Sequence, residues 1–194
     1  MAGEGLLNRF IDRDARSQGN GAIRAIWWGT LIAGALDITS AIVIWGLRGA
    51  PAERILQSVA TGLLGRDSYS GGAATAFLGL LLHFLIMSVI VTIYVAASRR
   101  LTMLKEHPVL CGAAYGVAVY LFMSYVVLPL SAAAGPLPPA RAVMEGLMVH
   151  IPCVGIPIGI VTSRFTSRGS AAARCRLMGS IPKHSRCRRE SRCP

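Results

Sequence analysis

Charged residues are scarce in this sequence. Only 15% of its 194 residues are Asp, Glu, Lys or Arg, and the nine acidic residues are outnumbered by 20 basic ones. The sequence also lacks a glycine-rich phosphate loop, a nucleophile elbow and an HExxH motif. These absences argue against an ATP-driven protein and against a soluble enzyme, so we expect a chain without enzymatic activity and without a bound cofactor.

The cysteines do not form a disulfide framework. Of five cysteines, Cys111 and Cys153 fall in apolar blocks and the other three lie in a basic C-terminal tail, where their spacing is too irregular for a zinc site. A cytoplasmic tail favours free thiols. A cleavable signal peptide is not expected either, because residues 1–25 are mostly polar and the apolar block that follows them is too long for one.

Long apolar blocks are what the sequence has in abundance. Hydrophobic residues make up 53% of the chain and its mean hydropathy is +0.53, well above the level of a soluble domain. Four blocks are long enough to cross a bilayer as helices, at about residues 26–47, 73–97, 109–131 and 143–162. We predict an all-α fold, a polytopic membrane bundle of four transmembrane helices within residues 26–165, between a cytoplasmic N-terminal segment at 1–25 and a disordered basic cytoplasmic tail at 166–194.

The connections between the blocks predict one further helix, and the prolines within the blocks predict breaks in two of the spans. After Pro51, apolar residues recur at helical spacing on one face, which predicts a short interfacial helix between the first two spans. A helix packed on the mouth of the bundle is the alternative. Pro129 should bend or end the third span, and Pro152 and Pro157 should interrupt the hydrogen-bond ladder of the fourth.

Basic residues predict the orientation. The N-terminal segment, the loop after the second span and the tail together hold sixteen of the 20 Lys and Arg residues, and the other two loops hold four. By the positive-inside rule, both termini lie in the cytoplasm. Since the basic residues lie almost wholly outside the apolar blocks, we interpret them as topology signals and lipid contacts and expect no nucleic-acid partner.

Three ionisable residues lie inside predicted spans: Asp37, His83 and His150. At about 1.5 Å of rise per residue, Asp37 and His83 lie about 15 Å from the outer ends of their spans and His150 about 10 Å. An ionised Asp at the centre of a spanning helix costs about 2.5 to 3.5 kcal/mol on insertion scales. Each of these residues therefore needs a partner or a function, and their similar depth predicts one polar centre.

The third and fourth spans supply further polar candidates. Tyr115, Tyr120 and Ser124 of the third span can reach the same depth and hydrogen-bond to the centre. Glu145, near the outer end of the fourth span, either caps the helix N-terminus or lines a substrate entrance.

The centre has several interpretations. It can be a buried pair that only fixes helix register, or it can handle protons, an ion or a small solute. If it holds a metal, Asp37, His83 and His150 are the ligands, and two facing histidines can clamp a haem, although no helix carries a paired ligand spacing.

Two GxxxG matches permit close helix contact. They comprise Gly112 with Gly116 and Gly155 with Gly159. Such motifs support packing within one chain or dimerisation. In a chain with 21 glycines we favour packing within the chain, while a homo-oligomer through these four glycines remains open. The lipid bilayer is the one partner that the sequence itself requires.

The order of these features resembles the YagU-like family, a group of uncharacterised bacterial inner-membrane proteins. The resemblance covers about residues 26–162 and consists of a first span, an interfacial segment, a second span with His83, a third closing on Leu128, Pro129 and Leu130, then Pro138 and Pro139 before a last span with His150. The loop after the first span differs from the family pattern, and the tail has no counterpart in it. The resemblance implies a bacterial inner membrane and no known activity.

Three functional hypotheses follow. The first is a membrane protein whose Asp37, His83 and His150 handle protons, an ion or a small solute. The second is a metal- or haem-binding redox membrane protein, and the third is a structural or assembly subunit of a membrane complex that acts through its glycine faces.

Overall fold

The computed structural model describes residues 2–133 and 135–166, with side chains described at residue 16 and from residue 19 onward. Helices make up nearly all of this part of the chain, which contains no strand. The predicted tail lies outside the described residues apart from Thr166. The predicted all-α fold is confirmed.

Four helical segments are long and apolar enough to span a membrane. They are Gly19–Gly46, Gly72–Arg100, Pro108–Leu130 and Ala140–Thr166. Between 17% and 33% of the most apolar part of each is buried inside the protein, so most of the apolar side chains face outward. Such a surface is stable in lipid and not in water. The four predicted spanning helices are therefore confirmed.

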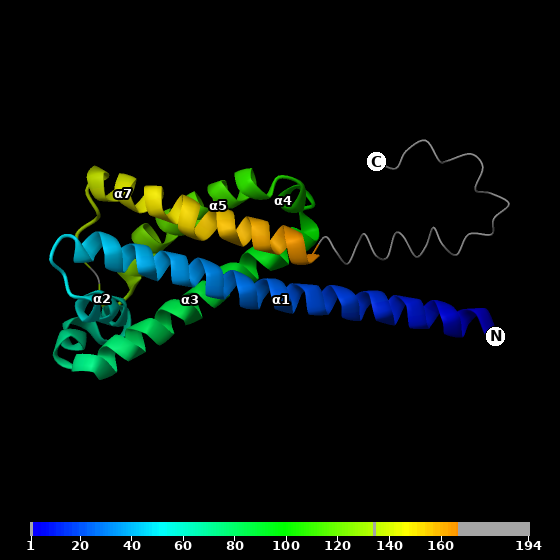
Figure 1. The fold of residues 1–194 in the computed structure, drawn as a ribbon, viewed down its shortest axis with the longest axis horizontal. Helices are drawn as coiled ribbons and strands as arrows, with labels where there is room; N and C mark the ends of the chain where they lie inside the picture. The colour runs from blue at the N-terminus through cyan, green and yellow to red at the C-terminus, as the bar shows by residue number, and fades with distance from the viewer. Residues whose placement is uncertain (1, 134, 167–194) are drawn as a thin grey trace.

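The first span belongs to one long helix, α1, which runs from Ala2 to Gly46 and extends beyond the rest of the bundle at its N-terminus (Figure 1). The N-terminal segment that we expected to be separate continues this helix without a break, because no proline interrupts it. The helix ends before Gly49, whose positive φ of 89° favours glycine, and Pro51 starts the next helix.

Between the first two spans lie α2 (Ala52–Leu64) and the 3₁₀ turn η1 (Gly65–Ser70). Helix α2 packs against α3 (Gly72–Arg100), where Gln57 Nε2 donates a hydrogen bond of 3.1 Å to the Gly72 carbonyl. The Leu56 carbonyl lies against Gly79, where a Cβ would collide with it. The structure thus shows the predicted helix and its packing on the bundle, while its place at the membrane surface remains a prediction.

The remaining elements complete the third and fourth spans. The short α4 (Met103–Glu106) leads into α5 (Pro108–Phe122), the π-helical η2 (Met123–Val127) and α6 (Leu128–Leu130). The fourth span consists of α7 (Ala140–His150), the π-helical η3 (Ile151–Gly155) and helical residues 156–166.

The π-helical turns coincide with prolines. Segment η2 ends two residues before Pro129, and η3 contains Pro152 and ends two residues before Pro157. Proline has no N–H and its ring collides with the carbonyl four residues earlier, so the regular ladder cannot pass through it. A wider turn accommodates the break. The predicted interruption of these two spans is confirmed.

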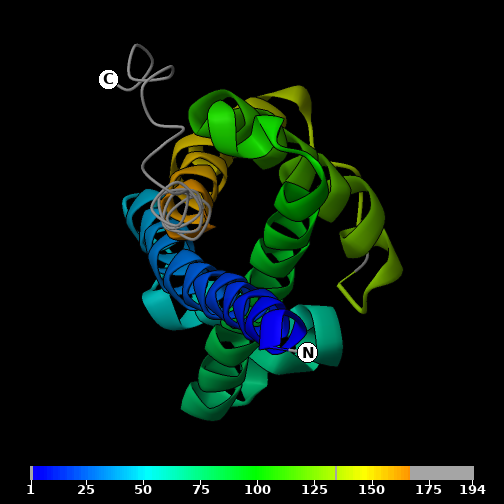
Figure 2. The ribbon, with the colours of Figure 1, turned by 90° about the vertical axis from the view of Figure 1, so that its right-hand side faces the viewer.

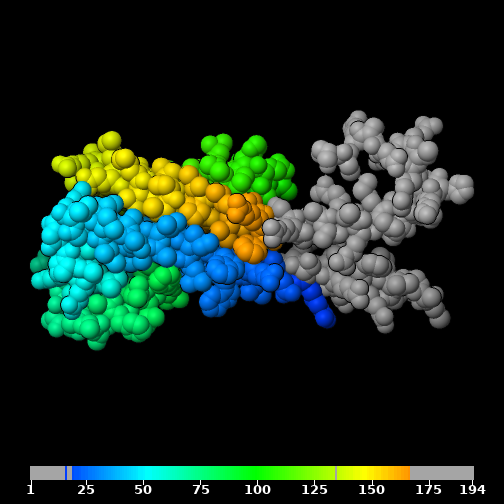
Figure 3. All heavy atoms as spheres, viewed as in Figure 1, coloured from blue at the N-terminus to red at the C-terminus, as the bar shows by residue number. Residues whose placement is uncertain are grey.

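Helix α1 packs on both α3 and the fourth span, and α5 packs on the fourth span. The space-filling view shows α1 and the fourth span side by side (Figure 3), and the view along the bundle shows the helices arranged around its long axis (Figure 2). We call the two ends of the bundle the α2 end and the α4 end after the short helices that lie there (Figure 1).

The hydrophobic core occupies the half of the bundle nearer the α4 end. Val91 of α3 and Val154 and Ile158 of the fourth span are fully buried there. Tyr94 and Tyr115 pack with their ring centroids 4.9 Å apart, and the Tyr115 hydroxyl donates a 2.8 Å hydrogen bond to the Ile90 carbonyl. The tyrosines join α3 to α5, so this half is closed by packing.

The four glycines of the GxxxG matches lie where α5 meets the fourth span. All four are buried, and a Cβ at Gly112 would lie 2.6 Å from the Gly155 carbonyl oxygen, closer than carbon atoms allow. Their packing within one chain is thus confirmed.

We predict that Gly112→Ala destabilises the protein by about 1 to 3 kcal/mol, because the added methyl group must push two helix backbones apart. The matched control is Gly62→Ala in α2, where a Cβ would meet nothing within 4 Å. This control should leave stability unchanged or raise it by up to about 1 kcal/mol. Thermal unfolding in mild detergent, followed by circular dichroism, measures both. Equal midpoints for the two variants would contradict the glycine contact.

Candidate functional site

Asp37 lies on the wall shared by two cavities in the half of the bundle nearer the α2 end. One cavity, of about 510 Å³, lies between α1, α5 and α7, and we call it the α7 cavity. The other, of about 600 Å³, lies between α1, α2 and α3, and we call it the α2 cavity. Asp37, Ala41 and Trp45 line both, because a spacing of four residues places them on one face of α1.

The Asp37 carboxylate has no hydrogen-bond or ion-pair partner among the described residues. It makes no hydrogen bond or ion pair with any described side chain or backbone group, and the residue is half-buried. An ionised carboxylate at this depth is unfavourable without a compensating charge or donor. The carboxylate is therefore placed to receive its partner from a cavity.

His83 is held between α3 and α1. Its side chain is 8% exposed, and Nε2 lies 2.9 Å from the Gly34 carbonyl oxygen, one turn before Asp37. A carbonyl oxygen can only accept, so Nε2 carries the proton and donates it to this bond. Nδ1 remains free to accept a hydrogen bond or a proton, and the residue lines the α2 cavity.

His150 is held by its own helix. Its Nδ1 lies 3.0 Å from the Gly146 carbonyl oxygen, and its ring packs edge-on against Tyr120 at 5.1 Å between centroids. By the same reasoning Nδ1 donates, which leaves Nε2 as the free nitrogen. His150 lines the α7 cavity.

Asp37 therefore shares one cavity with His83 and the other with His150. The two histidines line different cavities, for which α1 is the common wall. Across the described residues, no three His, Cys, Asp or Glu side chains gather in a group that could hold a metal ion. The structure therefore does not bring Asp37, His83 and His150 together around one point.

Of the polar candidates in the third span, Tyr120 belongs to the site and two others do not. Tyr120 lines the α7 cavity and donates a 3.1 Å hydrogen bond to the Ala142 carbonyl. Tyr115 lies in the core of the opposite half, and Ser124 lies in the π-helical η2 and lines neither cavity.

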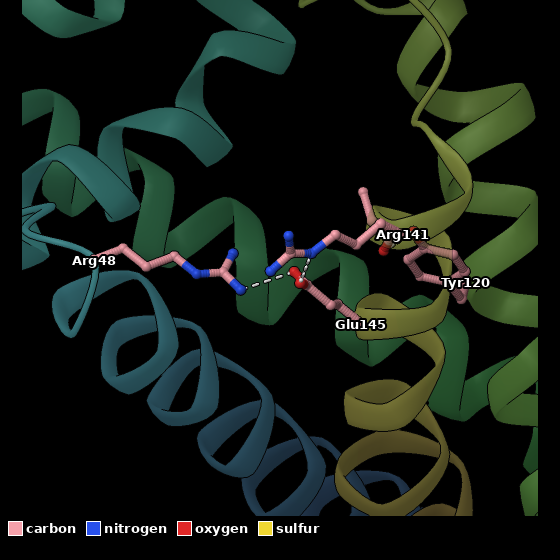
Figure 4. Close-up of polar contacts among 5 residues, drawn as sticks. Arg48, Tyr120, Arg141 and Glu145 are labelled. Atoms are coloured by element: carbon pink, nitrogen blue, oxygen red, sulfur yellow. Dashed lines mark hydrogen bonds and ion pairs between the residues drawn. The ribbon is translucent and has the colours of Figure 1, made fainter.

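An ion cluster of Arg48, Arg141 and Glu145 lies at the α7 cavity (Figure 4). Arg48, just after α1, pairs with Glu145 at 2.9 Å, and Arg141 pairs with the other oxygen of Glu145 at 3.1 Å. The Arg48 guanidinium also lies 4.9 Å from the centre of the Trp45 ring. The cluster connects the end of α1 to the beginning of α7.

Glu145 does not cap α7, because the helix begins five residues earlier and the carboxylate accepts hydrogen bonds from the two arginines. The sequence contained one part of this signal: Arg141 and Glu145 stand four residues apart, a spacing that pairs side chains on a helix. The pairing with Arg48, 97 residues away in the chain, depends on the packing of α1 against α7.

The α2 cavity has a different basic residue. The Arg54 guanidinium lies over the Tyr69 ring, 5.1 Å from its centre, and both residues line this cavity with Ser58. Within the described residues, Arg54 has no acidic partner within ion-pair distance. The sequence did not single out this residue, since a lone arginine in a short amphipathic helix carries no distinguishing spacing.

Four helices with apolar outer faces define a multi-pass integral membrane protein. Comparison with protein-family models, with curated proteins and with solved structures finds no match for this chain. The function must therefore be inferred from the site itself.

We predict that Ala41→Cys, in a background with the five native cysteines replaced by serine, reacts in detergent with a charged water-soluble thiol reagent, because residue 41 lines both cavities. Ala25→Cys, at a fully buried position of the packed half, should not react. With a negatively charged reagent, adding Glu145→Gln should raise the reaction rate at residue 41 severalfold. Arg48 and Arg141 lose their acidic partner in this variant and attract the reagent. If Ala41→Cys reacted as slowly as Ala25→Cys, the cavities would be closed to water.

Proposed function

We propose that this integral membrane protein binds a small solute with a cationic group, and that Asp37 is the residue that receives the cation. The observation that supports the proposal is the Asp37 carboxylate, which has no partner among the described residues and lies on the shared wall of two cavities. Both cavities fall in the range of about 300 to 1,000 Å³ that is typical of small-molecule sites.

The geometry favours a solute over a bare ion. A desolvated metal cation needs several oxygen or nitrogen ligands around it, and no such group of three His, Cys, Asp or Glu residues exists in the described part. An ammonium group needs less, because one carboxylate and a few acceptors satisfy its donors. His83 Nδ1 and His150 Nε2 are such acceptors as long as they stay neutral.

We further propose that the α2 end faces the outside of a bacterial inner membrane and that the α4 end and both termini face the cytoplasm. The positive-inside rule supports this orientation, since Arg99, Arg100 and Lys105 lie at the α4 end. The resemblance to YagU-like proteins supports the bacterial membrane. In this orientation the cavities lie in the outer half, and the packed core separates them from the cytoplasm.

The orientation can be tested in intact bacterial cells with a membrane-impermeant thiol reagent, in the cysteine-free background. Ser58→Cys lines the α2 cavity and should be labelled in intact cells. Thr102→Cys, an exposed position in the loop at the α4 end, should be labelled only after lysis. The opposite pattern would invert the proposed orientation without affecting the site.

Binding can be followed through Trp45, which lines both cavities. The chain has three tryptophans, so Trp27→Phe with Trp28→Phe leaves Trp45 as the only one. Titration with n-butylamine should change its fluorescence in a saturable manner. We expect Asp37→Asn to weaken this binding at least tenfold, because one charge-assisted hydrogen bond contributes about 1.5 to 3 kcal/mol.

The matched control for this titration is Asp67→Asn, which neutralises an exposed aspartate in η1 that lines neither cavity. It should bind n-butylamine like the parent. If Asp37→Asn and Asp67→Asn both behaved like the parent, Asp37 would be a structural residue and the proposed function would be wrong.

A further inference from the structure

The α2 cavity contains two opposite charges that do not pair. The Asp37 carboxylate and the Arg54 guanidinium both line it, yet they form no ion pair within 4.0 Å. At the α7 cavity, in contrast, both arginines form an ion pair with Glu145. The α2 cavity is therefore the one of the two whose arginine is left to bind something else.

The fold keeps the two charges apart. Asp37 is carried by α1 and Arg54 by α2, and the Arg54 guanidinium is held over the Tyr69 ring of η1. Arg54 is exposed and Asp37 half-buried, so water in the cavity of about 600 Å³ can solvate the two charges separately. A molecule with a positive and a negative end would compensate both charges at once.

The remaining walls indicate what joins the two ends. Ile38, Val59 and Trp45 give the cavity apolar sides, which fit a short hydrocarbon linker. His83 lines the same cavity as Asp37, with Nδ1 free to accept from an ammonium group. Tyr69 lines the same cavity as Arg54 and adds a hydroxyl group that can donate to an acid group, whereas the Ser58 hydroxyl already donates to the Ile55 carbonyl at 2.6 Å.

We propose that the α2 cavity binds a zwitterion, with its ammonium group on Asp37 and its acid group on Arg54. This inference rests on the proposed function, since it takes Asp37 as the cation-binding residue, and it adds the chemical class of the solute. Two sources supply this chemistry: a free amino-acid-like solute, or the headgroup of phosphatidylethanolamine in the membrane.

The first experiment compares ω-amino acids from glycine to 6-aminohexanoate with n-alkylamines of the same chain length, in the variant with Trp45 as its only tryptophan. At least one ω-amino acid should bind at least tenfold more tightly than its alkylamine, as expected of one charge-assisted contact. Arg54→Gln should remove this advantage and leave alkylamine binding unchanged. Asp37→Asn should weaken the binding of both series.

The control variant is Arg66→Gln, the same substitution at an arginine of η1 that lines neither the α2 nor the α7 cavity. It should keep the full preference for the ω-amino acid. A preference that Arg54→Gln and Arg66→Gln reduce equally would reflect the general positive potential of this end and would overturn the proposal.

The second experiment tests the lipid source. The same variant is placed in nanodiscs of phosphatidylglycerol alone and of phosphatidylglycerol with phosphatidylethanolamine. A change in Trp45 fluorescence that requires phosphatidylethanolamine and is lost in Arg54→Gln would support the zwitterion site and identify a headgroup as its occupant. An Arg54-dependent preference among ω-amino acids without this change identifies a free solute.

The outcomes also separate the two proposals. If alkylamines bind through Asp37 while neither the ω-amino acids nor phosphatidylethanolamine depend on Arg54, the zwitterion site is wrong and the proposed function stands. If alkylamines do not bind, or bind without dependence on Asp37, the proposed function fails and the zwitterion site fails with it.

Discussion

Close contact between helix backbones is the interaction on which the rest of this structure depends. Lipid removes the hydrophobic driving force between spans, so helices associate through packing and hydrogen bonds where small residues let them approach. Here a glycine lies at three such contacts: Gly21 against the Phe165 carbonyl, Gly79 against the Leu56 carbonyl, and Gly112 against the Gly155 carbonyl. These contacts fix the helix positions, and the cavities are the space that remains between them.

The contacts are distributed unevenly between the two halves of the bundle. In the half nearer the α4 end, Val91, Val154 and Ile158 are fully buried and Tyr94 and Tyr115 join α3 to α5. In the other half, α1 is flanked by a cavity on each side. Asp37 lies in this hollow half, on the wall that the two cavities share.

Much of the fold could be predicted from the sequence, because in a bilayer length and hydropathy decide which segments cross and backbone hydrogen bonding makes them helices. The depth of Asp37, His83 and His150 followed from counting residues along straight helices. What could not be predicted was rotation about the helix axes and the tilt between helices. These decide that His83 and His150 line different cavities, that Ser124 lines neither of them, and that Arg48 reaches Glu145. The continuation of α1 to Ala2 was also missed, because polar composition was taken as a boundary where no residue breaks the helix.

The position of Asp37 also limits how the two cavities can act together. One carboxylate serves both, and it can compensate one full positive charge at a time. An ammonium group bound from the α2 cavity would neutralise Asp37 and so remove the charge that the α7 cavity offers to a second cation. Coupling of this kind is reciprocal by thermodynamic necessity. The shared wall of α1, and no moving part, is therefore sufficient to make cation binding on one side depend on the occupancy of the other.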